Sequence, residues 1–285
     1  MIGIKEQNIK PLAGIKILSL ACNLPGPVAV AELQKMGGAV TKIEPPQGDP
    51  LERYCPGWYE KLIIDQKLVI LDLKDYYGQK QLDKLLEESD LLITSMRPAA
   101  LEKLGLEQRE LHACFPRLLQ IQIVGYPDPR ENVAGHDLTY LADLGLLTPP
   151  NLPKTLLADL AAAQEIVSTA LAMLLARERR LETSYFARIS IADAAAKFAA
   201  PHEYGLTATG GLLGGGFAGY NIYETADGSI SVAALETHFW QTLLSELNQK
   251  DATGKELPQI FLTRTAAEWE LWANERDIPL TALRP

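Results

Sequence analysis

Short apolar runs alternate with longer amphipathic stretches along the first 125 residues. Helices are expected from residue 27 to about 36 and over 77–88, where apolar residues recur at helical spacing. Between and beyond them, strands of four to seven residues are expected at 14–20, 39–44, 68–73, 91–94 and 118–124. Alternation of strands with helices is typical of βαβ units, which build a parallel sheet. The sequence therefore predicts an α/β fold.

The second half of the chain changes pattern twice. A proline-rich bridge at 148–153 precedes a long helix expected over 156–180. A strand and a helix follow at 187–191 and 192–200, and then Pro201 and a glycine-rich loop mark a boundary. Beyond it, the pattern predicts two strands joined by an Asp-Gly turn and two helices, at 221–225, 229–233, 239–247 and 266–274. We therefore expect a large α/β domain over 1–204 and a smaller α/β domain over 205–285.

Composition and charge exclude several classes of protein. The 285 residues carry 27 Lys and Arg against 36 Asp and Glu, a net charge of −9, which argues against nucleic acid as a partner. A phosphorylated small ligand held by a few cations remains compatible with this charge. The first ten residues lack the apolar segment of a signal peptide, and the apolar run at 166–176 is too short to cross a bilayer. A cytoplasmic protein without a membrane partner is expected, and its three widely spaced cysteines are expected to be reduced thiols.

Familiar cofactor and metal motifs are missing from the sequence. The loop after the first strand, residues 21–27, is not G-x-G-x-x-G, and its prolines lack the N–H groups that would bind a pyrophosphate. No P-loop, H-E-x-x-H, C-x-x-C or G-x-S-x-G motif is present. The sequence therefore disfavours an NAD enzyme and an α/β-hydrolase, and it predicts no metal site.

A few titratable residues stand out by their position. His136 follows an irregular loop, and a lone histidine is more often structural than catalytic. Asp159 interrupts an apolar run, where it is either a helix N-cap or a buried acid with a shifted pKa, and the spacing favours the cap. Glu236 lies between a strand and a helix, where a cap is again expected, and the triglycine at 214–216 is either a linker or a close approach to a ligand. Together, the imidazole and the two carboxylates could perform general acid–base chemistry.

An ordered series of segments resembles CoA-transferase family III, also called the CaiB/BaiF family. The segments are 11–20, 26–27, 37–46, 48–50, 71–74, 89–93, 96–98 and 104–106. This family comprises CoA transferases and α-methylacyl-CoA racemases. The resemblance implies a Rossmann-like parallel sheet in the large domain and an acyl-CoA substrate. Coenzyme A would then be part of the substrate, with no tightly bound cofactor.

The second half is more similar to the racemase branch of that family. Segment 134–142 is similar to its Gly-His-Asp segment, and 156–159 matches the segment with the family's catalytic aspartate. Segment 213–216 is similar to its glycine loop, and 223–236 resembles the segment whose glutamate partners the histidine. The resemblance therefore implies that His136, Asp159 and Glu236 are catalytic. It also implies that CoA is contacted by Lys42, Arg97, Gly215 and Gly216.

Three activities follow from the resemblance. In a racemase or epimerase, His136 and Asp159 would move a proton on and off the α-carbon of a 2-methylacyl-CoA, through an enolate stabilised by N–H groups at the start of the Asp159 helix. In a CoA transferase, Asp159 would attack the thioester and form a mixed anhydride. The third is a non-catalytic acyl-CoA-binding homologue.

Departures from the family pattern keep the non-catalytic reading open as an alternative. Alanines at 161–163 replace glycines, Pro45 replaces an arginine, and the chain ends at Pro285 before the usual return to the large domain. Relatives form interlocked homodimers, so a homodimer is expected here. The sequence leaves undecided whether its two subunits interlock.

Overall fold

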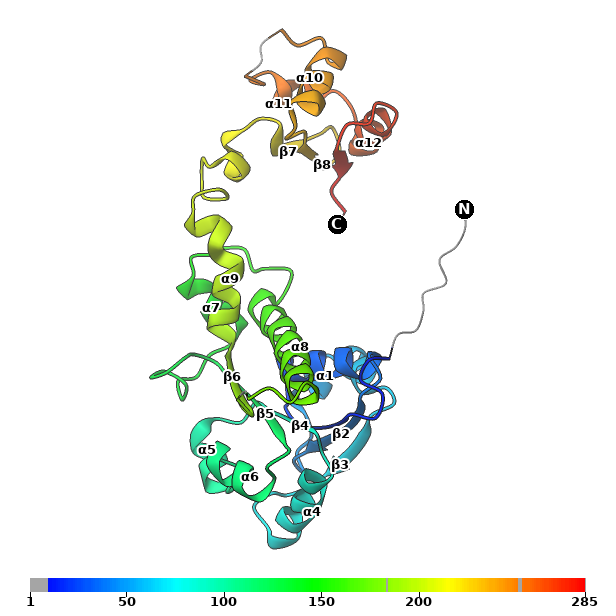
Figure 1. Ribbon diagram of the computed structural model, residues 1–285. Helices are drawn as coiled ribbons and strands as arrows, with labels where there is room; N and C mark the ends of the chain where they lie inside the picture. Colours follow the sequence, from blue (N-terminus) through cyan, green and yellow to red (C-terminus); the bar gives the residue numbers. More distant parts are fainter. Residues whose placement is uncertain (1–9, 183, 251–252, 285) are drawn as a thin grey trace. The chain divides into compact units, whose positions relative to one another are not determined.

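The computed structural model describes residues 10–182, 184–250 and 253–284. The chain divides into two compact units, Met1–Phe198 and Ala199–Pro285 (Figure 1). The boundary expected from sequence, between residues 204 and 205, lies slightly further along, just after the helix that joins the two units.

Unit 1 is built on a six-stranded sheet in which every neighbouring pair is parallel. Its strands are β1 (Lys16–Leu20), β2 (Ala39–Glu44), β3 (Lys67–Ile70), β4 (Leu91–Thr94), β5 (Leu119–Val124) and β6 (Phe186–Ser190). Their order, β3-β2-β1-β4-β5-β6, is that of the doubly wound nucleotide-binding sheet. The predicted α/β fold class is confirmed. Because the order reverses between β1 and β4, a ligand site is expected outside the carboxyl ends of these strands.

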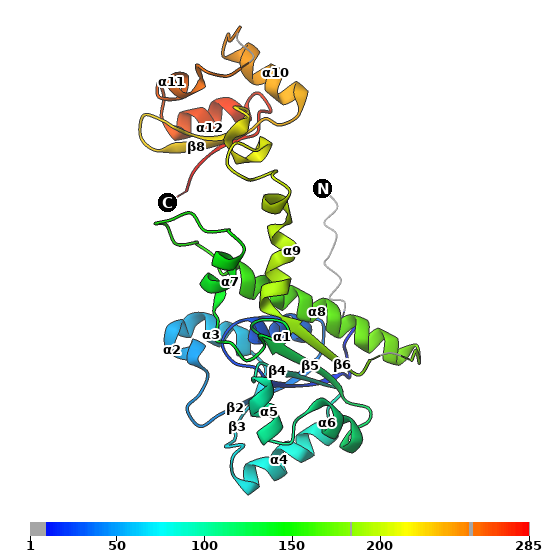
Figure 2. The same cartoon turned by 90° about the vertical axis from the view of Figure 1, so that its left-hand side faces the viewer.

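Helices cover both faces of this sheet (Figure 2). One face carries α1 (Pro25–Lys35) and α8 (Leu157–Glu178). The opposite face carries α4 (Tyr76–Glu87), α5 (Pro98–Lys103) and α6 (Gln108–Cys114). The shorter helices α2 (Pro50–Tyr54), α3 (Pro56–Ile63) and α7 (Asp137–Asp143) lie in the connections, and α9 (Ile191–Glu203) follows β6.

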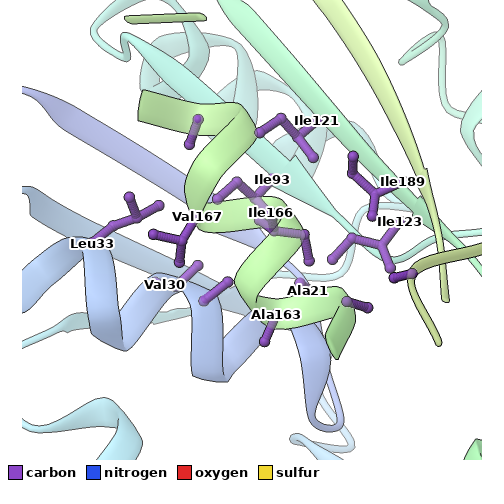
Figure 3. Close-up of a cluster of buried hydrophobic side chains, with 14 of the residues drawn as sticks. Ala21, Val30, Leu33, Ile93, Ile121, Ile123, Ala163, Ile166, Val167 and Ile189 are labelled. Carbon is purple, nitrogen blue, oxygen red and sulfur yellow. The ribbon is translucent and has the colours of Figure 1, made fainter. Parts of the chain in front are cut away.

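Alternate side chains of the central strands β1 and β4 enter different cores. Ile17 and Ile93 belong to the cluster under α1 and α8, whereas Leu18 and Leu92 belong to the cluster under α4 and α6. This alternation is the period of two expected for a strand buried on both faces. Figure 3 shows the first cluster, in which isoleucines of the sheet meet Ala163, Ile166 and Val167 of α8.

Helix α8, of 22 residues, is the longest described helix of unit 1. By length and composition alone α8 could cross a bilayer, but half of its 18-residue apolar stretch is buried inside the fold. Its small side chains, including Ala158, Ala162 and Ala170, are fully buried and let α1 and the sheet approach closely. Core packing therefore accounts for its apolar composition.

Unit 2 is a small antiparallel sheet covered by helices. Its strands, β7 (Tyr220–Glu224), β8 (Ser229–Ala233) and β9 (Leu280–Ala282), pair in the order β7-β8-β9. The predicted hairpin between β7 and β8 is present. The helices are α10 (Thr237–Glu246), α11 (Leu257–Phe261) and α12 (Ala266–Asn274). A glycine-rich turn, η1 (Leu212–Gly216), in which Gly214 and Gly215 have non-helical backbone angles, precedes β7. The core of unit 2 is aromatic, and the Trp269 indole donates a hydrogen bond to the Phe261 carbonyl at 2.8 Å.

Candidate functional site

Two neighbouring cavities open where the strand order reverses. Cys22 and Asn23, just after β1, and Ser95, just after β4, line both cavities. The Cys22 N–H donates to the Ser95 Oγ at 3.1 Å and fastens the two strand ends to each other. The cavity volumes are about 780 Å³ and about 240 Å³. The cavities therefore lie at the place where a doubly wound sheet binds its ligand.

The smaller cavity brings together two of the predicted catalytic residues. His136 precedes α7 and Asp159 lies in the first turn of α8, and both line this cavity. The His136 N–H donates to Thr139 Oγ1 at 3.0 Å, which fixes the backbone at the start of α7. The histidine is exposed, so its ring faces an accessible space. The remaining lining residues are Cys22, Asn23, Pro25, Ser95, Arg97, Ile123, Val124, Gly125, Glu131, Val133, Ala134, Gly135, Tyr140 and Ile191.

Asp159 is a shielded acid and not a helix cap. The N-cap of α8 is Leu156, which makes no side-chain cap hydrogen bond. The Asp159 N–H instead donates to the Asp137 Oδ1 at 3.0 Å. Burial, and secondarily the negative charge of Asp137, raise the pKa of Asp159 to about 7. The structure thus contradicts the cap favoured by spacing, and it leaves the Asp159 N–H unavailable to an enolate oxygen.

Asp137 is a site residue that sequence reasoning missed. It is buried at the first position of α7, directly after His136. Its carboxylate binds the start of another helix, so its role depends on a contact between α7 and α8 that spacing does not reveal. The only available signal was its position inside the segment that resembles the racemase branch.

A buried tyrosine forms one wall of the smaller cavity. A Cβ on Gly125 would lie 2.5 Å from the Tyr140 hydroxyl oxygen, and a Cβ on Gly135 would lie 2.6 Å from a Tyr140 ring carbon. Both positions therefore need glycine. Burial, followed by the charge of Asp159, raises the pKa of Tyr140 to about 12, so its hydroxyl stays protonated.

Lys42 is part of a buried ion-pair cluster. Its ammonium lies 2.6 Å from Glu44 Oε1 and 2.6 Å from Asp49 Oδ2, and its side chain is 1% exposed. Tyr59 donates a hydrogen bond to Glu44, and Asp49 accepts one from the Asn23 N–H at 2.9 Å. Lys42 lines neither cavity. This placement argues against the expected contact between Lys42 and a phosphate, and it indicates that Lys42 holds the loop after β1 in place.

Other cations do face the cavities. Arg97, expected to contact CoA, lines the smaller cavity together with Asp159. Lys74 and Lys103, neither of which was singled out from the sequence, line the larger cavity and are exposed. Lys74 ends the segment 71–74 that carries the family resemblance. Among the described residues, no group of three His, Cys, Asp or Glu side chains could hold a metal ion.

The remaining predicted site residues lie in unit 2. Glu236 is the exposed N-cap residue of α10, but its side chain makes no cap hydrogen bond. In η1, Gly215 has φ +90°, and a Cβ on Gly216 would lie 2.3 Å from the Gly210 carbonyl oxygen. These two glycines are therefore required by the loop's own backbone. The roles of Glu236 beside His136, and of Gly215 and Gly216 in CoA binding, stay predictions.

The sequence model of CoA-transferase family III matches residues 12–285, and the chain belongs to this family. It is 27% identical to human α-methylacyl-CoA racemase over 90% of this chain and 74% of that protein. It is 33% identical to the cinnamoyl-CoA:phenyllactate CoA-transferase of Clostridium sporogenes, but over only 47% of this chain and 36% of that protein. A crystal structure of Rv3272 from Mycobacterium tuberculosis matches the fold with a TM-score of 0.83 at 23% identity, covering 97% of this chain and 86% of that one.

Proposed function

We propose that this protein is an acyl-CoA racemase or epimerase. The observation that carries the proposal is the presence of His136 and Asp159 in one cavity, with the pKa of Asp159 raised to about 7. An acid–base group exchanges protons fastest when its pKa lies near the working pH. Both proton-transfer groups that a two-base mechanism requires are therefore available, and one of them is tuned to neutral pH.

The reaction exchanges a proton at the α-carbon of the thioester. Ionised Asp159 removes the α-proton from one face, and the electron pair of the C–H bond moves into an enolate. Protonated His136 then returns a proton to the opposite face. The enolate oxygen carries negative charge, and Arg97, which lines the same cavity, supplies a positive charge to stabilise it.

Coenzyme A would bind with its nucleotide end in the larger cavity and its thioester end in the smaller cavity. The larger cavity has the volume and the exposed amines of Lys74 and Lys103 for the phosphorylated nucleotide end. The thioester would then pass Cys22 and Ser95, which line both cavities, to reach Asp159. Replacing Lys74 and Lys103 by alanine should weaken CoA binding about tenfold and reduce its salt dependence. Lys80→Ala, an exposed change on α4 outside the lining of that cavity, is the control in the same calorimetric titration.

A CoA transferase is the second candidate, favoured by the same raised pKa. A more basic carboxylate is a stronger nucleophile, and relatives named as CoA transferases share up to 33% identity with this chain. Asp159 would attack the thioester carbonyl, forming an acyl–aspartyl anhydride and releasing the CoA thiolate. The thiolate would attack the aspartyl carbonyl, releasing the acyl carboxylate and leaving an aspartyl-CoA thioester.

One argument for the non-catalytic alternative is weakened by the packing of α8. Ala161, Ala162 and Ala163 are buried in the hydrophobic core and line neither cavity. Their methyl groups therefore contact core side chains and leave the space beside Asp159 free. The replacement of family glycines by these alanines is thus compatible with an active site.

Proton exchange at the α-carbon tests the proposal directly. In D₂O, the wild type should replace the C2 proton of a 2-methylacyl-CoA by deuterium, followed by NMR. Asp159→Asn and His136→Gln should each slow exchange by at least about a hundredfold. Asp143→Asn, on the exposed side of α7, is the matched control and should leave the rate unchanged.

Three outcomes separate the candidate functions. Exchange that depends on His136 and Asp159 supports the racemase. Absence of exchange, combined with hydroxylamine trapping of an activated Asp159 carboxyl in the presence of an acyl donor, supports the transferase. Tight binding of acyl-CoA with neither reaction supports the non-catalytic homologue and overturns the proposal.

A further inference from the structure

Two glutamines lie buried on strand β5. Gln120 and Gln122 are 3% and 2% exposed. Ile121 and Ile123, which alternate with them, enter the cluster under α1 and α8, so the two glutamines lie on the opposite face of the sheet. On that face the neighbouring strand β4 places Leu92 beside Gln120, in a hydrophobic cluster. Buried amides in such a position cost free energy unless they are hydrogen-bonded, so core packing alone does not account for them.

The two glutamines line a third cavity, of about 290 Å³. It shares no lining residue with the two cavities described above. Leu101 of α5 lines the third cavity, whereas Lys103 of the same helix lines the larger cavity and Arg97, just before the helix, lines the smaller one. A cavity of this volume can hold a small molecule. The third cavity is therefore a separate candidate site within unit 1.

The protein uses only part of the hydrogen-bonding capacity of these amides. Gln120 Nε2 donates to the Leu106 carbonyl at 3.3 Å, and Gln122 Oε1 accepts from Arg188 Nε at 3.1 Å. Among the described residues, no group donates to the Gln120 Oε1. The fully shielded polar atoms without a partner lie on other residues, so this oxygen keeps access to the cavity. A ligand could supply the donor that the described parts of the chain do not.

Two arginines face the same cavity without a counter-ion. Arg109, on α6, and Arg188, on β6, line the third cavity and are exposed. Neither arginine belongs to an ion pair formed among the described residues. Glu107 also lines the cavity, but it is exposed and pairs with neither of them. With two guanidinium groups against one carboxylate, the lining favours an anion.

These groups together define the class of ligand. A guanidinium binds a carboxylate through two parallel N–H···O bonds, and the Gln120 Oε1 can accept a bond from an N–H group. Phe186 and Leu101 line the same cavity and offer apolar contact. A phosphate ion would use the arginines but neither the amide oxygen nor the apolar side chains. A small organic acid with an amide N–H would use all three.

We propose that the third cavity binds a small organic carboxylate that carries an amide N–H, with its carboxylate on Arg109 and Arg188 and its N–H on the Gln120 Oε1. The site lies outside the cavities assigned to CoA. Its occupation therefore does not depend on the proposed function.

Calorimetric titration with hippurate, in the absence of CoA, tests the proposal. Hippurate combines a carboxylate, an amide N–H and an aromatic ring in one small molecule. The wild type should bind it about tenfold more tightly than it binds hippuramide, the uncharged analogue, or inorganic phosphate. Arg109→Gln and Gln120→Met should each weaken hippurate binding about tenfold, because each removes one of the proposed hydrogen-bonding groups.

Two controls separate binding at this site from general charge effects and from folding. Arg117→Gln removes the same charge from an exposed position outside the third cavity and should leave hippurate affinity unchanged. Among the described residues, Arg109 forms no ion pair, so Arg109→Gln should unfold in urea at the same concentration as the wild type.

Several results would overturn the inference. One is that the wild type does not bind hippurate, and another is that Arg117→Gln weakens binding as much as Arg109→Gln does. Phosphate bound as tightly as hippurate would mean an adventitious ion only. Competitive displacement of hippurate by CoA would place hippurate in the cavities assigned to CoA. Failure of CoA and its esters to bind would instead overturn the proposed function, and Arg109-dependent hippurate binding would still support this site.

Discussion

The carboxylate of Asp137 accepts a hydrogen bond from the backbone N–H of Asp159 at 3.0 Å. The first N–H groups of a helix have no partner within it, so Asp137 satisfies one of these groups at the start of α8. The same contact places a negative charge beside the Asp159 carboxyl, which adds to burial in raising its pKa. One buried residue on α7 thus influences both the position and the proton affinity of the candidate catalytic acid.

Removing that charge should shift the pH dependence of activity. Asp137→Asn keeps a carbonyl acceptor for the Asp159 N–H but removes the negative charge, so the pKa of Asp159 falls from about 7. Because the ionised carboxylate is the active base, the rising limb of kcat/KM should move to lower pH, by about one unit. The measurement is the pH profile of α-proton exchange for Asp137→Asn, the wild type and Asp143→Asn. An unchanged limb in Asp137→Asn would show that Asp137 does not affect the titration of Asp159.

The raised pKa of Asp159 also predicts a stability effect that does not require turnover. The unfolded carboxyl has a pKa of about 3.9, so between that pH and about 7 the folded state holds more protons than the unfolded state. Ionisation of Asp159 therefore destabilises the fold as pH rises through this window, and the full cost is present above it. Asp159→Asn removes the cost.

The melting temperature of Asp159→Asn minus that of the wild type should be at least about 2 °C larger at pH 8 than at pH 4.5. Scanning calorimetry at the two pH values measures this difference, and Asp143→Asn supplies the baseline for an exposed acid. A difference of the opposite sign would mean that the folded protein stabilises ionised Asp159.

Much of the fold was predictable because burial on both faces leaves a strong signal in sequence. The runs around Ile17 and Ile93 contain consecutive apolar residues, as expected for strands inside a parallel sheet, whereas around Ile121 apolar residues alternate with buried glutamines. The helices α5 and α6 were not predicted because six or seven residues span fewer than two turns and show little periodicity. Strand β9, of three residues, is likewise too short for its pattern to be distinguished.

The candidate site was only partly predictable, because several roles depend on tertiary contacts. His136 and Asp159 were identified through a family resemblance, and the structure brings them to one cavity. In the sequence, Lys42 cannot be distinguished from an exposed lysine of a strand. Its pairing with Asp49 depends on how the loop after β2 folds back. The shielded Oε2 of Glu131 has no hydrogen-bond partner among the described residues, a property of the three-dimensional environment that has no counterpart in sequence spacing.

We expect Lys42 to be needed for the stability of the fold and not for contact with the ligand. Lys42→Met leaves Glu44 and Asp49 buried without their cation, which should cost about 3–5 kcal/mol in the free energy of unfolding, measured in urea. The control is Lys35→Met, whose pair with Glu32 is on the surface and should contribute less than about 1 kcal/mol. If Lys42→Met were as stable as Lys35→Met and lost CoA affinity, Lys42 would be a phosphate contact after all.

A methyl group at Gly135 should disrupt the wall of the smaller cavity. In Gly135→Ala the new Cβ would lie 2.6 Å from a ring carbon of Tyr140, which is fully buried and cannot move without repacking. Overpacking of this kind costs about 1–3 kcal/mol, and displacement of the neighbouring His136 backbone should also lower the exchange rate. Gly57→Ala, in α3 with no atom within 4 Å of the new Cβ, is the matched control and should preserve or slightly raise stability. Urea unfolding and α-proton exchange, measured on both variants, distinguish the two sites. Wild-type stability and exchange in Gly135→Ala would show that Tyr140 can move without consequence for the cavity.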